Sequence, residues 1–413
     1  MANDFNNIND NAALICKAAA EEFKESIQFV KSIAKVDPSE YNGKNGYKSG
    51  STIHISQPAR FDPQTTFDNT SSKQDVLEDY VPLTLDISST VGVEVDSTEF
   101  ASKIGLSSLY NRVISPAITS MAADVEQRML EKATDAVFNS VGTAGSTVFD
   151  TDTILSARER MNKYLCPKDK DRYFLSDSTA NRSAVNARKG LFNASPEISE
   201  QYKMGYMGTA DGFNWLENEV LNVHTMGNDV TGVALNTVTV VNGTNSLSVS
   251  GLTNTTGTVT KGSTFTIAGV YAVHPQTKQA YPFLQQFVVT ADATANGSGV
   301  ATLSISPTIY LTTSRQNVSA APATTAALTF SNSTVASTAY TQNLAYHKKA
   351  FRMVSVPLIM PEKAEMMAQE TVDGITIAIV RAWDQNKRSM ITRLDFLGGI
   401  CADRPEWACR IMA

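Results

Sequence analysis

The sequence is short of the features that mark membrane proteins, disulfide-rich secreted domains and nucleic-acid-binding proteins. No run approaches the ~20 apolar residues that cross a bilayer, and the first residues lack a secretion signal. The four cysteines are scattered without a CxxC pair, which favours reduced, buried thiols. The formal net charge of -6 argues against direct binding of DNA or RNA, because phosphate binding requires clustered Lys and Arg. These absences predict a soluble protein that is made in the cytoplasm.

Recognisable catalytic and metal-binding motifs are also missing. The four histidines, His54, His224, His274 and His347, are far apart in the sequence, and none lies in an HExxH motif. No glycine cluster fits a phosphate-binding loop of the GxxxxGK[ST] type. We therefore expect a protein that is not an enzyme and has no catalytic residue, cofactor or metal site. A catalytic or metal-binding histidine remains the alternative to four structural ones.

Charged residues make up 18% of the chain, below the roughly 25% of ordinary soluble domains, and the deficit lies in one segment. Between residues 231 and 340 the charged side chains are Lys261, Lys278, Asp292 and Arg315. This segment is rich in Thr, Ser, Val, Asn and Gly, and alternating runs predict strands at residues 237–241, 246–250, 264–270, 286–290 and 300–306. Because the charged composition resumes on both sides, we predict a small all-β, barrel-like domain inserted into a host domain.

The first hundred residues predict a helix followed by an extended arm. Apolar residues recur at helical spacing from residue 12 to about residue 34. Alternating runs predict strands at residues 51–57 and 82–95. The polar stretch between them, residues 58–79, has little to bury, so it should project as a two-stranded arm that contacts a partner surface.

The strongest helix signal begins at Ser115-Pro116, a favourable pair for a helix start. Apolar residues such as Ile118, Met121 and Val125 repeat at helical spacing, and Gly142 interrupts the pattern. The pattern predicts a helix over residues 116–141, roughly 40 Å long at 1.5 Å per residue.

Shorter elements are predicted on both sides of the inserted segment. Before it we expect helices at residues 152–165 and 179–189, a buried strand at 172–175 and a loop at 202–212. After it we expect a strand at 351–361, a helical turn at 361–369 and a strand at 374–381. The last residues are apolar, which is typical of a terminus tied into a sheet.

Three segments, in the same order along the chain, resemble the coat proteins of short-tailed double-stranded DNA phages. The closing sequence, TRLDFLGGICADRPEWACRI, is similar to the C-terminal signature of that family, and residues 392–395 and 404–410 carry the match. Residues 202–215, YKMGYMGTADGFNW, resemble the Gly-rich segment before the family's inserted domain. Residues 265–279, FTIAGVYAVHPQTKQ, resemble a stretch within that domain.

The resemblance implies an α+β fold of the tailed-phage major capsid type with an inserted β-barrel-like domain. It divides the chain into an N-terminal arm helix (1–45), an extended loop (46–82), a peripheral domain with a spine helix at 116–141 (83–170), the first part of an axial domain (171–226), the inserted domain (227–342) and the C-terminal part of the axial and peripheral domains (343–413).

The resemblance also implies the function of a major capsid protein that assembles with itself, as pentamers and hexamers, into an icosahedral shell. Scaffolding and portal proteins are the implied partners, double-stranded DNA is enclosed without specific binding, and no membrane is involved. Assembly is expected in the host cytoplasm, and the product is the virion capsid. The alternative is a tail-associated or adhesive phage protein whose β domain binds a glycan. The candidate assembly contacts are Ile53, Ile55, Arg60, Asp79, Lys261, Lys278, Asp292, Arg315, Arg404 and Glu406.

Overall fold

A computed structural model describes residues 7–36, 50–61, 78–96, 113–142, 144, 151–188, 208–229, 231–236, 239–331, 336–360, 366–387 and 389–412. The chain divides into two compact units, each assembled from separate stretches of sequence. Unit 1 contains Met1–Ile55, Val81–Leu130 and Phe351–Cys401. Unit 2 contains Ser56–Tyr80, Glu131–Ala350 and Ala402–Ala413.

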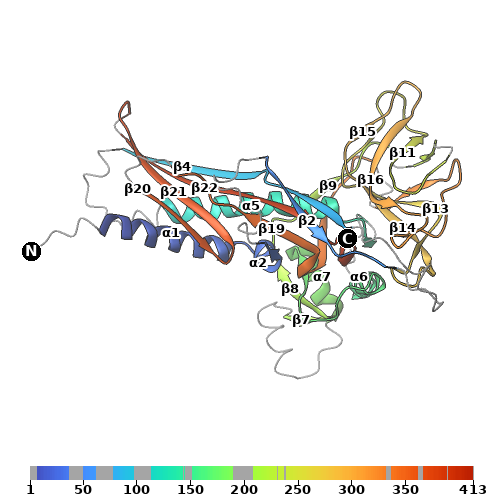
Figure 1. The fold of residues 1–413 in the computed structure, drawn as a ribbon, viewed down its shortest axis with the longest axis horizontal. Helices are drawn as coiled ribbons and strands as arrows, with labels where there is room; N and C mark the ends of the chain where they lie inside the picture. Colours follow the sequence, from blue (N-terminus) through green and yellow to red (C-terminus); the bar gives the residue numbers. More distant parts are fainter. Residues whose placement is uncertain are drawn as a thin grey trace, which may run out of the picture. The chain divides into compact units, whose positions relative to one another are not determined.

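Unit 1 is built on a six-stranded sheet in which long strands run side by side (Figure 1). The strand β22 (Ser389–Ala402) is the longest and pairs antiparallel with two neighbours, so that Leu394 lies opposite both Ile379 and Val91. The other strands are β1 (Ala34–Lys35), β4 (Ile87–Asp96), β19 (Phe351–Ser355), β20 (Met366–Val372) and β21 (Ile375–Asp384).

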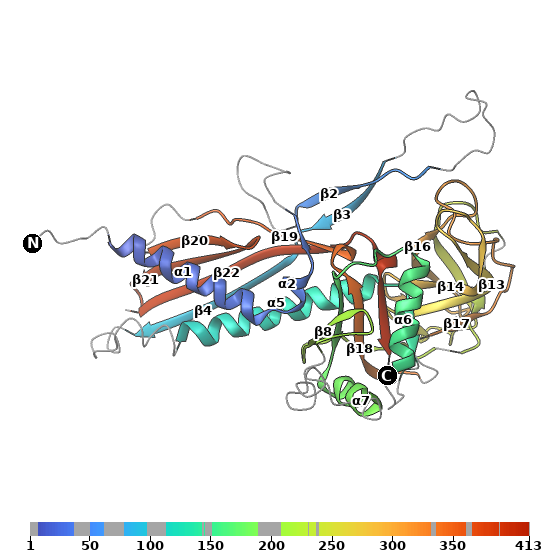
Figure 2. The same cartoon turned by 90° about the horizontal axis from the view of Figure 1, so that it is seen from below.

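The predicted N-terminal helix is confirmed in its first part and divided in its second. The helix α1 (Asn7–Ser26) packs on β20 and β21 (Figure 2), and the short helix α2 (Phe29–Ser32) follows after a break. In a continuous helix the amides of Gln28 and Phe29 would bond to carbonyl groups four residues earlier. They donate instead to the carboxylate of Glu126, at 2.7–3.1 Å, which ends the first helix.

The predicted spine helix is present as α5 (Ser115–Ala136), but its predicted end was wrong. The apolar stripe that contains Ile118, Met121 and Val125 is completely buried. The helix has 22 residues, about 33 Å, and does not extend to residue 141. Residues Ser140–Gly142 form the strand β5, because they pair in parallel with β23 (Ala408–Met412) and gain sheet hydrogen bonds there.

The strands β2 (Thr52–Gln57) and β3 (Asp79–Thr84) pair in a two-stranded sheet, as expected for the base of an arm. Residues 62–77, which include most of the predicted arm, lie outside the described residues. At the base, Ile53 and Ile55 pack with Leu83, Leu85 and other apolar residues of unit 1. The base of the arm is thus anchored in a hydrophobic cluster that it shares with other strands of unit 1.

The host part of unit 2 is a seven-stranded sheet covered by two helices, α6 (Thr151–Lys163) and α7 (Ser178–Arg188). Ile154 and Ala184 of these helices share a buried cluster with Phe174 and Trp215 of the sheet. Both helices and the strand at 172–175 were predicted, as was the tying of the last residues into a sheet. Besides β5 and β23, the sheet contains β6 (Arg172–Ser176), β7 (Thr209–Ala210), β8 (Phe213–Glu217), β9 (Val223–Thr225) and β18 (Ala339–His347).

The charge-poor segment folds into a closed antiparallel β-barrel, as predicted. Its sheet has the order β10-β11-β16-β14-β13-β17, and a bridge between Ala234 and Ala327 joins its two ends. Phe265, Phe287 and Leu303 are completely buried inside. Residues 239–241 of the first predicted strand are not in a strand. The barrel strands are β10 (Ala234–Leu235), β11 (Thr244–Ser250), β13 (Thr264–Val273), β14 (Ala280–Val289), β16 (Ala301–Ile309) and β17 (Leu328–Phe330), with β12 (Thr258–Val259) and β15 (Ala293–Thr294) as a separate pair.

Two predictions near the C-terminal third were wrong. The strand expected at residues 351–361 ends at Ser355, and the helical turn expected at 361–369 is strand from Met366 onward. The predicted helical turn is replaced by strand because β20 pairs with β21 in a hairpin, whose turn residues Asp373 and Gly374 both have positive φ, 51° and 73°. An Asp-Gly pair suits such a turn, and strand pairing overrides the weak helical signal.

Candidate assembly site

Two of the candidate assembly residues are used inside the subunit. Ile53 and Ile55 are 5% and 1% exposed and belong to the cluster that anchors the arm. Their side chains therefore leave little surface for a neighbouring chain. The other candidates all lie in unit 2.

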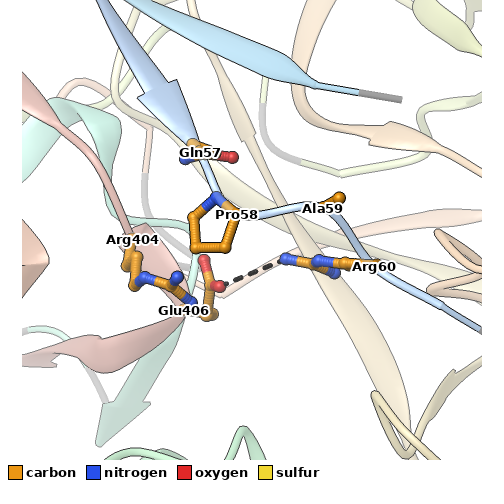
Figure 3. A pocket seen from close by; sticks show the side chains of 6 residues that line it. All are labelled: Gln57, Pro58, Ala59, Arg60, Arg404 and Glu406. Atoms are coloured by element: carbon orange, nitrogen blue, oxygen red, sulfur yellow. Dashed lines mark ion pairs between the residues drawn. The ribbon is translucent and has the colours of Figure 1, made fainter. Parts of the chain in front are cut away.

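Arg60, Arg404 and Glu406 are brought together in a shallow pocket beside the base of the arm (Figure 3). Arg60 Nη2 lies 3.5 Å from Glu406 Oε1, and the guanidinium of Arg404 stacks 4.5 Å from the centre of the Trp407 ring. The side-chain amide of Gln57 donates to the backbone carbonyl of Asp403 and so connects the two chain segments, 57–60 and 403–406, that line the pocket. We call the set Gln57, Pro58, Ala59, Arg60, Arg404 and Glu406 the arm-base pocket.

Asp79 and Arg315 also meet, although they are far apart in the sequence. Arg315 Nη1 lies 3.1 Å from Asp79 Oδ2, so that a strand of the arm contacts a loop of the barrel within one subunit. The side chains are 25% and 54% exposed, and an ion pair in that setting contributes about 0–1 kcal/mol.

The remaining charged side chains of the barrel are likewise engaged within the subunit. Lys261 Nζ lies 2.9 Å from Asp135 Oδ2, and the backbone amide of Lys261 donates to Asp292 at 2.6 Å. Burial would lower the pKa of Lys261, but the hydrogen bond and charge of Asp135 outweigh it and raise that pKa. Lys278 Nζ donates to the backbone carbonyl of Ser314 at 2.6 Å.

Sequence reasoning missed Arg410, which is completely buried. Its Nε and Nη2 both donate to the carbonyl of Val137, Nε at 2.8 Å. Its Nη1 donates to the carbonyl of Gly262 at 2.6 Å and to Gln342 Oε1 at 3.2 Å. Burial lowers the pKa of Arg410 to about 10. The closing sequence motif contained this residue, but no local pattern signals that an arginine lies in a core.

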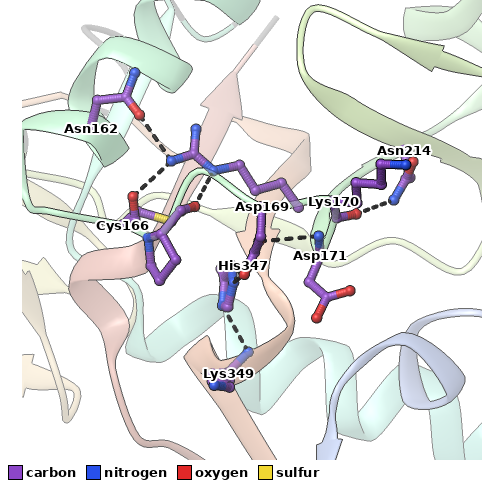
Figure 4. Close-up of polar contacts among 10 residues, drawn as sticks. Asn162, Cys166, Asp169, Lys170, Asp171, Asn214, His347 and Lys349 are labelled. Atoms are coloured by element: carbon purple, nitrogen blue, oxygen red, sulfur yellow. Dashed lines mark hydrogen bonds and ion pairs between the residues drawn. The ribbon is translucent and has the colours of Figure 1, made fainter.

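A second polar network surrounds the loop between α6 and β6 (Figure 4). The buried ring of His347 donates from Nε2 to Asp169 at 3.1 Å, while its Nδ1 accepts the amide of Lys349. Burial alone would raise the pKa of Asp169, but hydrogen bonds from His347 and from the Asp171 amide lower it. Arg172 fixes the same loop by donating to the carbonyls of Pro167 and Cys166, each at 2.8 Å.

The other histidines in unit 2 are also committed to structural contacts. His224 Nε2 lies 3.0 Å from the carbonyl of Lys261, and His274 Nδ1 accepts the amides of Gln276 and Thr277. Within the described residues, no group of three or more His, Cys, Asp or Glu side chains could hold a metal ion. All four cysteines are buried and reduced, as predicted. No helix in the described part of the chain is long and apolar enough to cross a membrane.

Comparison with solved structures finds phage capsids. The chain is similar to a structure described as Mycobacterium phage Che8, with 13% identity, a TM-score of 0.48 and coverage of 93% of this chain and 90% of that chain. It is similar to the capsid of the cyanophage P-SCSP1u, with 13% identity, a TM-score of 0.43 and coverage of 89% and 85%. The CUS-3 coat protein I-domain is 26% identical over 24% of this chain and 95% of that chain, with a TM-score of 0.19. No curated protein matches the sequence.

The family comparison is decisive because it extends over nearly the whole chain. The model described as "P22 coat protein - gene protein 5" matches residues 1–412. It confirms the resemblance seen in the three sequence segments, and it does not favour a tail-associated or adhesive protein. The chain therefore belongs to the P22 coat protein family, and it is a major capsid protein of the tailed-phage capsid fold whose copies form the shell of a phage virion.

Proposed function

We propose that this coat protein assembles as pentamers and hexamers into an icosahedral procapsid in the host cytoplasm, guided by a scaffolding protein and a portal protein. Membership of the coat protein family is the observation that carries the proposal. A shell with pentamers and hexamers needs one subunit that tolerates slightly different angles between its neighbours. The assignment of residues 1–45, 46–82, 83–170, 171–226, 227–342 and 343–413 to arm, loop, peripheral, axial and inserted regions is part of the same proposal.

We further propose that the shell encloses double-stranded DNA without binding it specifically. The net charge of -6 supports this, because a protein that grips phosphate needs an excess of basic side chains. Several basic groups in unit 2 are already paired with carboxylates, among them Lys261 with Asp135 and Arg315 with Asp79. A wall of this kind confines DNA and leaves it free to be packed and ejected.

The proposed function is structural, without a catalytic step, a cofactor or a metal. The family is one of shell proteins, which supports it. The contacts of His347 support it too, since both ring nitrogens are used for Asp169 and for the Lys349 amide. A general base would need one nitrogen directed at a substrate.

The arm-base pocket is our first candidate for a contact between subunits. Arg60 and the adjacent Phe61 are exposed, Phe61 at 59%, and Glu406 is only partly buried. A large exposed apolar side chain beside charged groups is typical of a protein contact surface. Asp79, Lys261, Lys278, Asp292 and Arg315 remain weaker candidates, because each has a partner in its own subunit.

The experiment is assembly of purified subunit with scaffolding protein, followed by electron microscopy. We expect closed shells, and a subunit that stays monomeric or forms only open fibres would contradict the proposal. Phe61→Ser tests the exposed surface beside the arm-base pocket, and Tyr271→Ser, a matched aromatic replacement at a 43% exposed barrel position, is the control. Phe61→Ser should slow shell formation while Tyr271→Ser should not.

A further inference from the structure

The inserted barrel is joined to the host part of unit 2 by only two chain crossings. The strand β9 leads into the barrel and the start of β18 leads out of it, and the two pair antiparallel, with His224 opposite Tyr340. Among the described residues, 339–341 of β18 pair with β9 alone, whereas the pairing of β18 with β23 and β6 begins at Gln342 and Leu344. A two-stranded ribbon of this kind can twist and bend. Contacts beside the ribbon must therefore set the direction in which the barrel points.

Arg410, a completely buried residue of the host strand β23, makes one of these contacts. One edge of its guanidinium bonds to the carbonyl of Val137, which directly follows the last residue of α5. Another nitrogen bonds to the carbonyl of Gly262, in the turn that precedes the barrel strand β13. One buried side chain thus connects the end of a helix, the host sheet and the barrel.

The hydrogen bonds of Arg410 favour one orientation of the barrel relative to the host sheet. None of the atoms that accept hydrogen bonds from the Arg410 side chain is a carboxylate oxygen; they are two backbone carbonyls and the Gln342 amide oxygen. The charge of the nearby Asp135 carboxylate favours the charged guanidinium, but a buried charge whose acceptors are neutral still depends on its donors remaining bonded. The carbonyl at the helix end carries negative partial charge and compensates part of the cost. Rotation of the barrel would remove the Gly262 carbonyl and leave buried donors without acceptors.

The surroundings of Gly262 restrict the arrangement further. Gly262 has a φ of +84°, and a Cβ atom there would lie 2.7 Å from Asp135 Oδ1 and 3.0 Å from His224 Cδ2. The barrel turn therefore approaches the helix end as closely as a glycine permits. The Lys261–Asp135 ion pair lies beside this close contact.

A second set of hydrogen bonds in unit 2, between Gln286 and Ser140, also holds the barrel to the host sheet. The side-chain amide of Gln286, in barrel strand β14, accepts from the amide of Ser140 at 2.9 Å and donates to its carbonyl at 2.8 Å. It therefore bonds to Ser140 as a neighbouring strand would, and all of these atoms are buried. Ser140 lies directly opposite Arg410 in the sheet, so the hydrogen bonds of Gln286 and those of Arg410 reach the barrel from neighbouring positions of β5 and β23.

From this geometry we infer that Arg410 is a positioning residue that sets the orientation of the inserted barrel on the host sheet of unit 2. The planar fork of arginine can hold the Val137 and Gly262 carbonyls together, whereas the point charge of lysine cannot span both in the same way. In an assembled shell, every subunit would then present its barrel at the same angle.

The test measures the orientation in the unassembled full-length chain. Thr179→Cys in α7 and Ser298→Cys in the barrel place spin labels at two exposed positions, and the four native cysteines are buried. Pulsed electron paramagnetic resonance then gives the distribution of distances between the labels. The parent should give one narrow peak. Arg410→Met should give a broader peak with a shifted maximum, and Arg410→Lys should fall between the two.

Controls separate orientation from folding and from assembly. Arg393→Met removes an arginine that is 59% exposed in unit 1, and it should leave the distribution unchanged. Circular dichroism checks that each variant retains its secondary structure. If Arg410→Met does not fold, Gln342→Leu, which removes one acceptor of the same guanidinium, takes its place and should also broaden the peak. An unchanged distance distribution in the folded variant would overturn the inference, whatever the result of the assembly experiment.

Discussion

Replacement of Glu126 by glutamine should release the junction between α1 and α2 without removing any side-chain volume. Glu126 is 2% exposed, and its carboxylate accepts the backbone amides of Gln28 and Phe29 at 2.7–3.1 Å. Hydrogen bonds to a charged group contribute roughly 1.5–3 kcal/mol, against about 0.5–1.5 kcal/mol for neutral ones. Glutamine keeps one acceptor oxygen, so we expect a loss of about 1–3 kcal/mol, whereas Glu126→Leu would leave both amides unbonded and cost about 2–6 kcal/mol.

The assay is hydrogen exchange, measured by mass spectrometry on the peptide that contains Gln28 and Phe29. A loss of 1–3 kcal/mol corresponds to exchange roughly five- to 150-fold faster if local opening controls it. Glu25→Gln, the same replacement at an exposed position of α1, is the matched control and should leave exchange unchanged. Equal exchange rates in Glu126→Gln and Glu25→Gln would refute the argument that the buried carboxylate holds the junction.

Three further predictions concern unit 2. Phe287→Ala, at a completely buried barrel position, should lower the free energy of unfolding by about 3–5 kcal/mol in urea titrations, and a loss below ~1 kcal/mol would contradict the assigned core. Burial, and then the charge of Arg410, lower the pKa of His224 from 6.5. As the pH falls, the unfolded chain therefore binds a proton at His224 before the folded chain does. The contribution of the neutral His224 to the free energy of unfolding is complete above pH 6.5 and declines below it. His224→Asn should reduce the pH dependence of unfolding in that range, and an unchanged slope would count against the reasoning. Arg315→Gln should change the free energy of unfolding by no more than about 1 kcal/mol, because its ion pair with Asp79 is partly exposed. A coupling free energy above that value, in a double-mutant cycle with Asp79→Asn, would contradict this prediction.

Local patterns in the sequence predicted the helices and strands in which apolar residues repeat at a fixed spacing. The apolar stripe of α5 and the alternating, Thr-rich strands of the barrel are examples, since each residue's environment repeats at a fixed spacing. The Asp373-Gly374 turn also carried a local signal, because Asp-Gly between alternating residues favours a hairpin. That signal could have identified β20 as a strand.

Features created by distant partners could not be predicted in this way. The end of α5 depends on the pairing of Ser140 with Arg410, and the break after α1 depends on Glu126. Most of the candidate assembly residues are charged side chains, and the sequence does not show which groups each of them contacts. The structure gives several of them partners from elsewhere in unit 2, as with Asp79 and Arg315. A single sequence contains no record of such pairings.

The position of β23 between β5 and β18 has a consequence for the order of events during synthesis. Ser140 leaves the ribosome long before Arg410, its partner across the sheet, is made. At translation rates of about 5–20 residues per second, the delay is roughly 15–50 s. During that interval the edge of β5 that later pairs with β23 has no partner strand. An unpaired strand edge can bind other chains, so we expect the nascent chain to need chaperones during this interval.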